Sequence, residues 1–518
     1  MPPLTDYTTY AEAQAHCTRE ALWALFDGDR DRLNIAEECL DRHRGRDLTI
    51  RIAHGDGRDE NFSFDEVADW AGRFANYLTA RGIAKGERVA LMLEPSLPFY
   101  FALFGAMKAG AVAVPLFTLF GPDGLALRID DCTPRLLLTT AELAERAQGR
   151  EGLQVVIADE ALMAELAGHE ARYESDTSAD DMAMYQYTSG TTRELPEAVK
   201  HRHKAVVTVM LAALYGTGVR PGDLFCCPSS PAWGHGLWHG TIAPLALGVS
   251  ITAWAGRFEA GRLLQVLQDY GITNLAAAAT HYRMMKNSGK AGNYRYETEK
   301  LSFTGEPIDS DTAEFAEATF GTPVCSMYGT TEVGVILGNY PGAPDIEVRP
   351  GALGKPMPGL EVEIQDPAGN ACPPDQVGEI MLRRPKGGWI PTRDRGHTDA
   401  DGYFYHDGRA DDVIISAGWT MSAVEIEDVL LKHPEVDEAA AIGVADALRG
   451  QAVKAFIVSH RPGDDAFAEE LQAFTKARLS RHEYPRLVEF TAALPKTPAG
   501  KVNRSLLRQQ ETAQGETV

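Results

Sequence analysis

The sequence predicts a multidomain α/β and α+β fold, with a large N-terminal region and a small C-terminal α+β domain. Helix-like and strand-like patterns alternate through the first 400 residues, glycine and proline become frequent between residues 341 and 388, and the pattern changes again after Gly408. At 518 residues, the chain is too long for a single compact core. We expect an N-terminal part over residues 1–407, with subdomains near 1–180, 181–340 and 341–407, and a C-terminal part over 408–518.

The N-terminal region is expected to contain two helix-flanked sheets, and one unit shows the pattern clearly. Ser63 and Glu66 form a capping-box signature, and an apolar helical face follows until Gly82. Residues 88–93 are a short apolar run typical of a strand covered on both faces, and residues 99–107 return to a helical pattern. The same alternation continues more weakly through residues 136–139, 154–158, 206–214 and 263–275.

Two later segments differ from this pattern. Short apolar runs at 360–364 and 379–382, among many glycines and prolines, predict a β-rich subdomain. After the expected joint at residues 408–412, Ser422 and Glu425 form a second capping-box signature. Strand-like runs at 439–444 and 453–458 follow, and then a helix with Phe467 and Leu471 on one face. About 110 residues suffice for a separate small domain.

Composition narrows the class of protein. The chain has 73 acidic and 50 basic residues, a net charge of −23, and no Lys/Arg-rich block, which argues against a nucleic acid or an anionic membrane as partner. Seven cysteines without a C-x-x-C pair indicate reduced thiols rather than a zinc site or disulfide framework. No secretory signal or bilayer-length apolar run is visible, so we expect a soluble cytoplasmic protein.

One loop contains an unusual number of hydroxyl side chains. Residues 187–192 read Tyr-Thr-Ser-Gly-Thr-Thr, directly after a strand-like run. Backbone amides and hydroxyls in such a turn can hold phosphate oxygens. Alone, the signal is weak, because the same composition is usually that of an ordinary solvated turn.

Four motifs in order resolve this ambiguity: residues 187–192, 326–332 (Ser-Met-Tyr-Gly-Thr-Thr-Glu), 407–412 (Asp-Gly-Arg-Ala-Asp-Asp) and 494–501 (Leu-Pro-Lys-Thr-Pro-Ala-Gly-Lys). Their order and spacing resemble the acyl-adenylate-forming superfamily, which includes AMP-forming acyl- and aryl-CoA synthetases, adenylation domains of peptide synthetases and firefly luciferase. The resemblance extends over nearly the whole chain. Residues 38–43 look most like the acetyl-, medium-chain- and benzoyl-CoA synthetase branch.

The resemblance implies a two-step reaction on a small carboxylic acid, with ATP, Mg²⁺ and CoA or phosphopantetheine. The carboxylate attacks the α-phosphate of ATP, giving an acyl-adenylate and pyrophosphate, and a thiol then displaces AMP. Because an anion must approach a polyanion, the site needs positive charge and donors placed around the α-phosphate.

The resemblance also implies residue roles. Lys501, Glu332 and Thr188 match catalytic positions, with Glu332 also expected to hold Mg²⁺. By themselves, Lys501 in a Pro-Ala-Gly-Lys turn and Glu332 at a helix start fit solvated surface residues, and packing at a domain seam is the alternative for Asp394 and the adenine-side residues. The full set of implied ATP- and AMP-binding residues is Thr188, Ser189, Gly190, Thr191, Thr192, Gly305, Glu306, Pro307, Tyr328, Gly329, Thr330, Thr331, Asp394 and Arg409.

The small domain is expected to be mobile. Asp411 falls at the hinge position of similar proteins, in which the domain rotates after adenylation and presents another face for the thiol step. Gly418 and Trp419 fall in the segment implicated in that step. Related CoA ligases commonly have an arginine where this chain has Thr420, which puts the thiol step in more doubt than adenylation.

The phosphate loop departs from the family pattern. Residues 193–198 read Arg-Glu-Leu-Pro-Glu-Ala, one residue longer than usual, without the usual glycine and with Glu197 at the usual lysine position. A carboxylate there repels phosphate unless it points away. Arg193 and Lys200 lie close enough in sequence to restore positive charge. Arg393 also replaces a glycine, which predicts a less tight loop before Asp394.

The acyl pocket is inferred by resemblance as well. Acetate-activating relatives close it with a tryptophan at the position of Gly329, so a glycine there favours a bulkier acid. The alanines at 276–279 also leave room, and Trp233 and Trp238 supply flat apolar walls. His235 either contacts a polar substituent or packs structurally between the tryptophans. The pocket residues expected are Trp233, His235, Gly236, Trp238, Ala279, Thr280, His281, Gly329 and Gly334.

The sequence thus predicts an AMP-forming ligase for a bulky, mainly apolar acid that is aromatic, alicyclic or medium-chain. One alternative is an adenylation-only enzyme that delivers the acyl group to a carrier protein or partner enzyme, which Thr420 keeps open. Another is a non-catalytic nucleotide-binding relative, suggested by Glu197. The joint presence of Lys501, Glu332, Asp394 and Arg409 argues against the second alternative.

Overall fold

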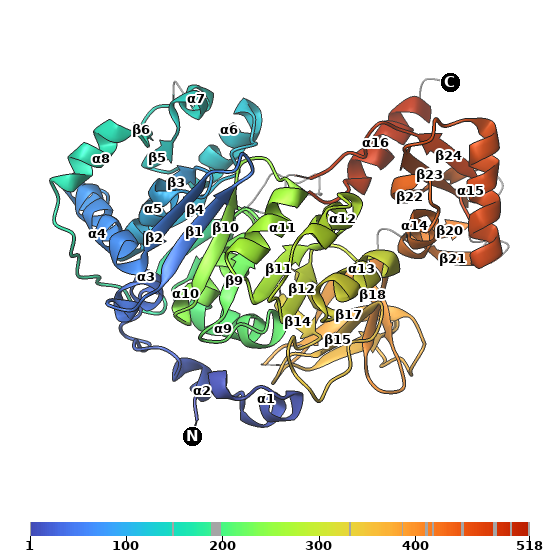
Figure 1. Cartoon of the computed structure of the whole chain (residues 1–518), viewed down its shortest axis with the longest axis horizontal. Helices are drawn as coiled ribbons and strands as arrows, with labels where there is room; N and C mark the ends of the chain where they lie inside the picture. The colour runs from blue at the N-terminus through green and yellow to red at the C-terminus, as the bar shows by residue number, and fades with distance from the viewer. Residues whose placement is uncertain are drawn as a thin grey trace.

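A computed structural model describes residues 2–147, 150–187, 198–330, 333–385, 387–409, 413–416, 419–446, 450–479, 484–497 and 500–515. It shows a large N-terminal region built on two sheets and a small C-terminal domain with its own sheet (Figure 1). The predicted mixed α/β multidomain fold is therefore confirmed. Among the described helices, none has the length and apolar character needed to cross a membrane.

The first sheet has six strands in the order β6-β5-β3-β4-β7-β8. Its strands are β3 (Arg88–Met92), β4 (Val112–Pro115), β5 (Leu136–Thr139), β6 (Gln154–Ile157), β7 (Met182–Gln186) and β8 (Val199–Arg202). All neighbours are parallel except β7 and β8, which form an antiparallel hairpin. The loop at residues 187–198 therefore joins two adjacent strands at one edge of the sheet.

Helices cover this sheet as the sequence predicts. Helix α4 (Phe64–Ala80) begins after Ser63, whose side chain accepts a hydrogen bond from Glu66 N, and it packs on α5 (Leu97–Lys108). Helices α6 (Pro122–Cys132), α7 (Ala141–Ala144) and α8 (Glu160–Ala167) complete this region. Before it lie α1 (Tyr10–His16), α2 (Arg19–Trp23) and α3 (Ile35–Cys39).

A longer path of thirteen strands runs through the rest of the N-terminal region, in the order β16-β17-β18-β19-β15-β14-β13-β12-β11-β9-β10-β1-β2. Strands β1 (Thr49–His54), β9 (Leu224–Cys227), β10 (Ser250–Ala255), β11 (Asn274–Ala278), β12 (Lys300–Thr304) and β13 (Val324–Thr330) are parallel neighbours. Strand β2 (Asp59–Ser63) pairs antiparallel with β1. The helices of this part are α9 (Ala205–Leu211), the π-helical segments η4 (Ala212–Gly216) and η5 (His235–Ile242), α10 (Ala243–Ala246), α11 (Ala260–Asp269), α12 (Ala279–Asn287) and α13 (Ser310–Phe320).

The glycine- and proline-rich segment forms the antiparallel end of this path. It contains β14 (Gly334–Gly338), β15 (Ala352–Pro356), β16 (Val362–Gln365), β17 (Gly378–Arg383), β18 (Trp389–Thr398) and β19 (Phe404–Arg409). Ile364, Ile380 and Leu382 form part of its own small core. The two short runs that predicted strands at 360–364 and 379–382 fall on β16 and β17.

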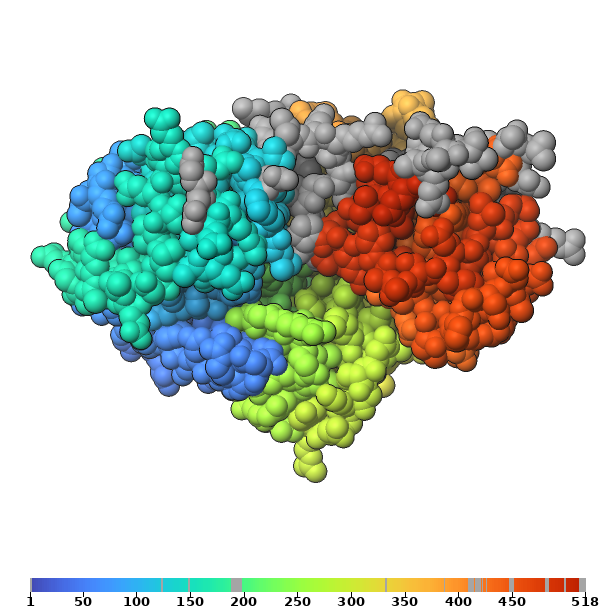
Figure 2. All heavy atoms as spheres, turned by 90° about the horizontal axis from the view of Figure 1, so that it is seen from above, coloured from blue at the N-terminus to red at the C-terminus, as the bar shows by residue number. Residues whose placement is uncertain are grey.

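The C-terminal domain has a five-stranded sheet. Its elements are β20 (Val413–Ser416), β21 (Trp419–Ser422), α14 (Ala423–Leu431), β22 (Val436–Asp446), β23 (Gly450–Ser459), α15 (Asp465–Arg478), β24 (Leu487–Phe490) and α16 (Arg504–Gly515). Strand β19 still belongs to the large sheet, so the change from one sheet to the other falls between residues 409 and 413. This domain lies beside the elements near α12 and α13 and across from the six-stranded sheet region (Figure 2).

All seven cysteines are among the described residues, and none is in a disulfide. Cys226 and Cys227 are adjacent on β9, and burial raises the pKa of Cys227 to about 11. These thiols are therefore protonated at neutral pH and serve as apolar core residues.

Candidate active site

Lys501 lies on a tight turn of the C-terminal domain that reaches the N-terminal region. Lys496 and Val502 form a β-bridge, and Thr497 N donates to Lys501 O at 2.7 Å. The Lys501 Nζ lies 5.6 Å from the ring centroid of Trp233, a cation–π distance. The turn therefore presents its ammonium group to the N-terminal region at Trp233.

Gly305, directly after β12, forms the surface that Lys501 meets. A Cβ at this position would lie 3.1 Å from Trp233 Cη2 and 3.4 Å from Lys501 Cε, and its φ of 101° suits glycine. The next residue, Glu306, accepts a hydrogen bond from Thr280 Oγ1 at 2.5 Å. Pro307 follows it, so the predicted adenine-side residues 305–307 adjoin the lysine.

Tyr328 and Asp394 meet at the end of β13. The Tyr328 hydroxyl donates to Asp394 Oδ2 at 2.7 Å, and the Asp394 carboxylate is 8% exposed. Asp394 N donates to Thr392 Oγ1, which tightens the local turn. Arg409 lies opposite Asp394 in the pairing of β18 with β19. The structure thus brings together three residues predicted to contact the nucleoside.

Arg393 adopts a backbone conformation that is most common for glycine. Its φ is 63°, in the left-handed region, which costs a non-glycine residue about 1–2 kcal/mol. Its N–H donates to Glu379 Oε1 at 3.2 Å. The backbone before Asp394 therefore keeps the turn that a glycine would give, although the side chain is an arginine.

Asp131 holds both ends of the loop that is predicted to bind phosphate, a contact that the sequence did not reveal. Its Oδ2 accepts from the Tyr187 hydroxyl at 2.6 Å and from Ala198 N at 3.2 Å. Tyr187 also donates to Arg128 O, and Lys200 lies over the ring of Tyr185 at 5.4 Å from its centroid. The Asp131 carboxylate of α6 thus fixes Tyr187 and Ala198, the two residues that flank residues 188–197.

Replacing Asp131 with alanine is expected to raise the KM for ATP about 3- to 10-fold, because each lost hydrogen bond contributes about 0.5–1.5 kcal/mol. Asp130→Ala is the matched control, since the neighbouring carboxylate pairs with Arg150 instead. Steady-state ATP titrations of both variants would check this. Equal KM values for the two variants would contradict the assigned role of Asp131.

On the expected acyl side, His235 is buried close to Lys501. Its Nδ1 lies 2.9 Å from Ser229 Oγ, and its ring is 5.3 Å from that of Trp233. Burial, with smaller effects from His239, His281 and Lys501, lowers the pKa of His235 well below its usual range. The imidazole is therefore neutral at physiological pH, and its buried Nε2 has no hydrogen-bond partner within the described residues.

The other expected pocket residues are buried in the core or held by local contacts. Trp238 is 7% exposed and donates to Gln186 Oε1 at 2.9 Å, and Ala279 is fully buried in the core beside α11. Gly236 packs tightly, since a Cβ there would lie 2.3 Å from Ser229 O. The Nδ1 of His281 accepts a hydrogen bond from Ala278 N at 3.1 Å, which fixes the ring at the start of α12.

Gly329 faces backbone rather than open space. A Cβ at Gly329 would lie 2.0 Å from Gly334 O and 2.6 Å from Val335 Cα, because β14 crosses it at a bulge. Gly334, with φ 72°, has nothing within 4 Å of its Cβ direction. A side chain at position 329 therefore requires movement of β14.

Several predicted residues lie outside the described residues: Thr188, Ser189, Gly190, Thr191, Thr192, Arg193, Glu197, Thr331, Glu332, Asp411 and Gly418. Thr330 ends β13, and Trp419 and Thr420 lie on β21. Among the described residues, no three His, Cys, Asp or Glu side chains group as a cation site. Glu332 is the residue predicted to hold Mg²⁺, so the described part of the chain offers no test of its fit to the ion.

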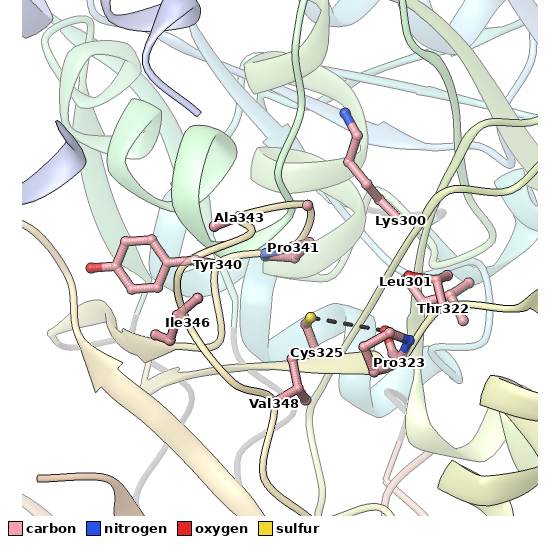
Figure 3. Close-up of a pocket in the computed structure, with 11 residues that line it drawn as sticks. Lys300, Leu301, Thr322, Pro323, Cys325, Tyr340, Pro341, Ala343, Ile346 and Val348 are labelled. Atoms are coloured by element: carbon pink, nitrogen blue, oxygen red, sulfur yellow. Dashed lines mark hydrogen bonds between the residues drawn. The ribbon is translucent and has the colours of Figure 1, made fainter. Parts of the chain in front are cut away.

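A cavity of about 250 Å³ lies elsewhere, at the beginning of β12 and β13 (Figure 3). Lys300, Leu301, Cys325 and Tyr340 are among the residues that line it, and the Cys325 thiol donates to Pro323 O at 3.9 Å. The residues of the candidate site follow the opposite ends of the same strands. The cavity is therefore distinct from the site.

Comparison with known proteins shows which family the chain belongs to. The family model described as "AMP-binding enzyme" matches residues 37–388, and that described as "AMP-binding enzyme C-terminal domain" matches residues 425–501. The chain is 29% identical to acetyl-coenzyme A synthetase of Bacillus subtilis, over 97% of this chain and 95% of that protein. It is 30% identical to the mitochondrial acyl-coenzyme A synthetase ACSM3 of Mus musculus, over 88% and 85%.

A solved structure is also similar. The anthranilate CoA ligase AuaEII, in complex with anthranoyl-AMP, superposes with a TM-score of 0.85 at 25% identity, covering 94% of this chain and 99% of that one. The first family model alone spans more than half of the chain. The chain therefore belongs to the AMP-binding enzyme family, among the acyl-CoA synthetases.

Proposed function

We propose that the protein activates a bulky, mainly apolar carboxylic acid with ATP to give acyl-AMP and pyrophosphate, and then transfers the acyl group to CoA. The observation that carries this proposal is the position of Lys501, whose ammonium lies over Trp233 and whose chain lies against Gly305. In this position a cation from one domain lies next to the residues of the other domain that are proposed to bind the nucleotide. Such a charge stabilises the transition state as a carboxylate attacks the α-phosphate.

The remaining roles follow from the site. Asp394, oriented by Tyr328, binds the ribose hydroxyls, Arg409 contacts the ribose or phosphate, and residues 305–307 border the adenine. The loop at 188–197, held at both ends by Asp131, borders the pyrophosphate. Mg²⁺ bound with ATP would offset the phosphate charge, and Glu332 is the proposed ligand.

The second half-reaction is proposed to follow rotation of the C-terminal domain about Asp411, with Gly418 and Trp419 near the thiol. The short connection between β19 and β20 supports this proposal, because only residues 410–412 join the two sheets. A few residues at the end of an element can absorb a large backbone change.

A single incubation tests the function. The protein is mixed with ATP, Mg²⁺ and a library of carboxylic acids, with and without CoA, and acyl-AMP and acyl-CoA are identified by mass. Acyl-CoA supports the proposal, and acyl-AMP without acyl-CoA would instead favour a carrier-protein or partner-enzyme acceptor. Neither product with any acid would favour a non-catalytic nucleotide-binding protein.

The size of the acid is a separate prediction. Trp233 offers a flat apolar wall, so acids the size of benzoate or octanoate are expected to exceed acetate in kcat/KM by about 100-fold. Each buried methylene group of the acid contributes about 0.8 kcal/mol to the binding free energy, and acetate has no such groups. Rates of pyrophosphate release across an acid series would check this. Faster turnover of acetate would contradict the inferred pocket, though not the adenylation chemistry.

A further inference from the structure

The turn that carries Lys501 is attached to the C-terminal domain by apolar residues on both of its sides. Leu494 before the turn and Leu507 after it are buried in one small cluster with Ala440 and Ile442 of β22. Burial of apolar side chains is favourable but has no preferred direction. These contacts therefore hold the turn against the sheet without fixing the direction in which Lys501 points.

Arg504, three residues after Lys501, forms a two-point ion pair with Glu427 of α14. Its Nε donates to Glu427 Oε1 at 3.1 Å, and its Nη2 donates to Oε2 at 2.5 Å. Glu427 Oε1 also accepts a hydrogen bond from Ala441 N of β22 at 2.7 Å, and the Glu427 side chain is 9% exposed. A planar guanidinium binds a carboxylate in a fixed orientation, so this pair sets the direction in which the chain leaves the turn.

The stability of α16 does not explain why an arginine begins this helix. The N-terminus of a helix carries a positive partial charge, so a cation there is unfavourable and an anion is favourable. Arg504 is the first residue of α16, and the first helical turn contains no acidic residue. Glu427 from another helix supplies the negative charge. A residue that opposes a local preference next to a reactive group is typical of a functional site.

We propose that Arg504 and Glu427 are positioning residues for Lys501, and that their ion pair directs the turn so that the ammonium group reaches Trp233. This inference rests on the proposed role of Lys501 in acyl-AMP formation. Lys501 Nζ lies 5.6 Å from the ring centroid of Trp233. Moving a catalytic group by about 1 Å slows a reaction by up to about 100-fold, even when the mutated residue does not touch the substrate.

The test compares Glu427→Gln and Arg504→Lys in the two half-reactions. Glutamine keeps an acceptor for Ala441 N, and lysine keeps the positive charge, but neither variant retains the charged two-point pair. Each variant is expected to slow single-turnover formation of acyl-AMP about 10-fold. Thioester formation from preformed acyl-AMP is expected to stay unchanged, because Lys501 serves only the first step in the proposed mechanism.

A double-mutant cycle with Lys501→Ala separates positioning from a general loss of structure. Glu427→Gln should cause no further loss in the Lys501→Ala background, because the group that the pair positions is then absent. Glu511→Gln is the matched control. Glu511 lies about 10 Å further along α16 and pairs with Lys454 of β23 at 2.6 Å, and Lys454 also pairs with Glu489. This control should form acyl-AMP at the unmodified rate.

Several results would overturn the proposal. They are an unchanged rate of acyl-AMP formation in both pair variants, an equal loss in thioester formation, or a loss in Glu427→Gln that adds fully to that of Lys501→Ala. An equal loss in Glu511→Gln would also overturn it, because the effect would then belong to the packing of α16 as a whole. If Arg504→Lys does not fold, Glu427→Gln decides the matter alone. An unmodified rate in Lys501→Ala would instead contradict the proposed function.

Discussion

Replacing Lys501 with alanine is expected to slow acyl-AMP formation about 100- to 1,000-fold, the usual effect of removing one preorganised charge from a transition state. The ammonium lies at a cation–π distance from Trp233, and the lysine chain contacts Gly305. No other lysine or arginine belongs to the turn between Lys496 and Val502. Single-turnover formation of acyl-AMP, with the melting temperature recorded in parallel, would measure the effect.

Lys476→Ala is the matched control for this variant. Its ammonium also lies over an aromatic ring, at 5.1 Å from the centroid of Tyr484, but on α15 within the same domain. Thioester formation from preformed acyl-AMP should be unaffected in Lys501→Ala, because the lysine serves only the first step in the proposed mechanism. A parallel loss in Lys476→Ala would show that the domain, rather than the site, had been disturbed.

Replacing Asp394 with alanine is expected to raise the KM for ATP about 10- to 150-fold, since hydrogen bonds to a charged group contribute about 1.5–3 kcal/mol. The carboxylate is buried and oriented by the Tyr328 hydroxyl and the turn at Thr392. The decisive measurement is the ratio of kcat/KM for ATP to that for 2′-deoxy-ATP. The unmodified protein should discriminate between them, whereas Asp394→Ala should treat them nearly alike.

Asp407→Asn provides the comparison, because this carboxylate lies on the adjacent strand and pairs with His397 at 2.8 Å. It should keep the preference for ATP. An unchanged preference for ATP in Asp394→Ala would contradict the assigned contact with the ribose, and Asp394 would then be only a structural partner of Tyr328.

The sequence predicted helices and strands well where residues close together in the chain determine them. The Ser63 cap begins α4, the apolar run at 88–93 becomes β3, and the glycine-rich segment becomes the antiparallel end of the large sheet. The order of four motifs was enough to place the chain in its family. These features depend on residues close together in sequence or on a fixed spacing.

Contacts between distant segments were not predictable in the same way. Asp131 holds Tyr187 and Ala198 from more than fifty residues away, and no pattern in α6 indicates it. Arg283 on α12 has no motif of its own, and its partners Glu306 and Asp309 lie more than twenty residues further along the chain. Both depend on the tertiary arrangement rather than on local propensity.

Strand geometry also modifies the expected acyl pocket. The four alanines at 276–279 suggest open space in the sequence, but Ala276 and Ala277 fall in core clusters on opposite faces of β11. Ala279 and Trp238 are likewise buried in the core. Trp233 is the aromatic residue of this set that contacts Lys501, and it borders the site most directly.

If Gly329 borders the acyl group as proposed, the close approach of β14 to it limits how acid preference can be engineered or can change in evolution. A tryptophan introduced at this position alone would drive its Cβ into the carbonyl of Gly334, so a narrower substrate range cannot be reached there by one codon change. A tryptophan at this position would first need a compensating change that moves β14 away from β13. Variation of Trp233, whose ring lies near Gly305 and Lys501, offers the shorter mutational path in the proposed pocket.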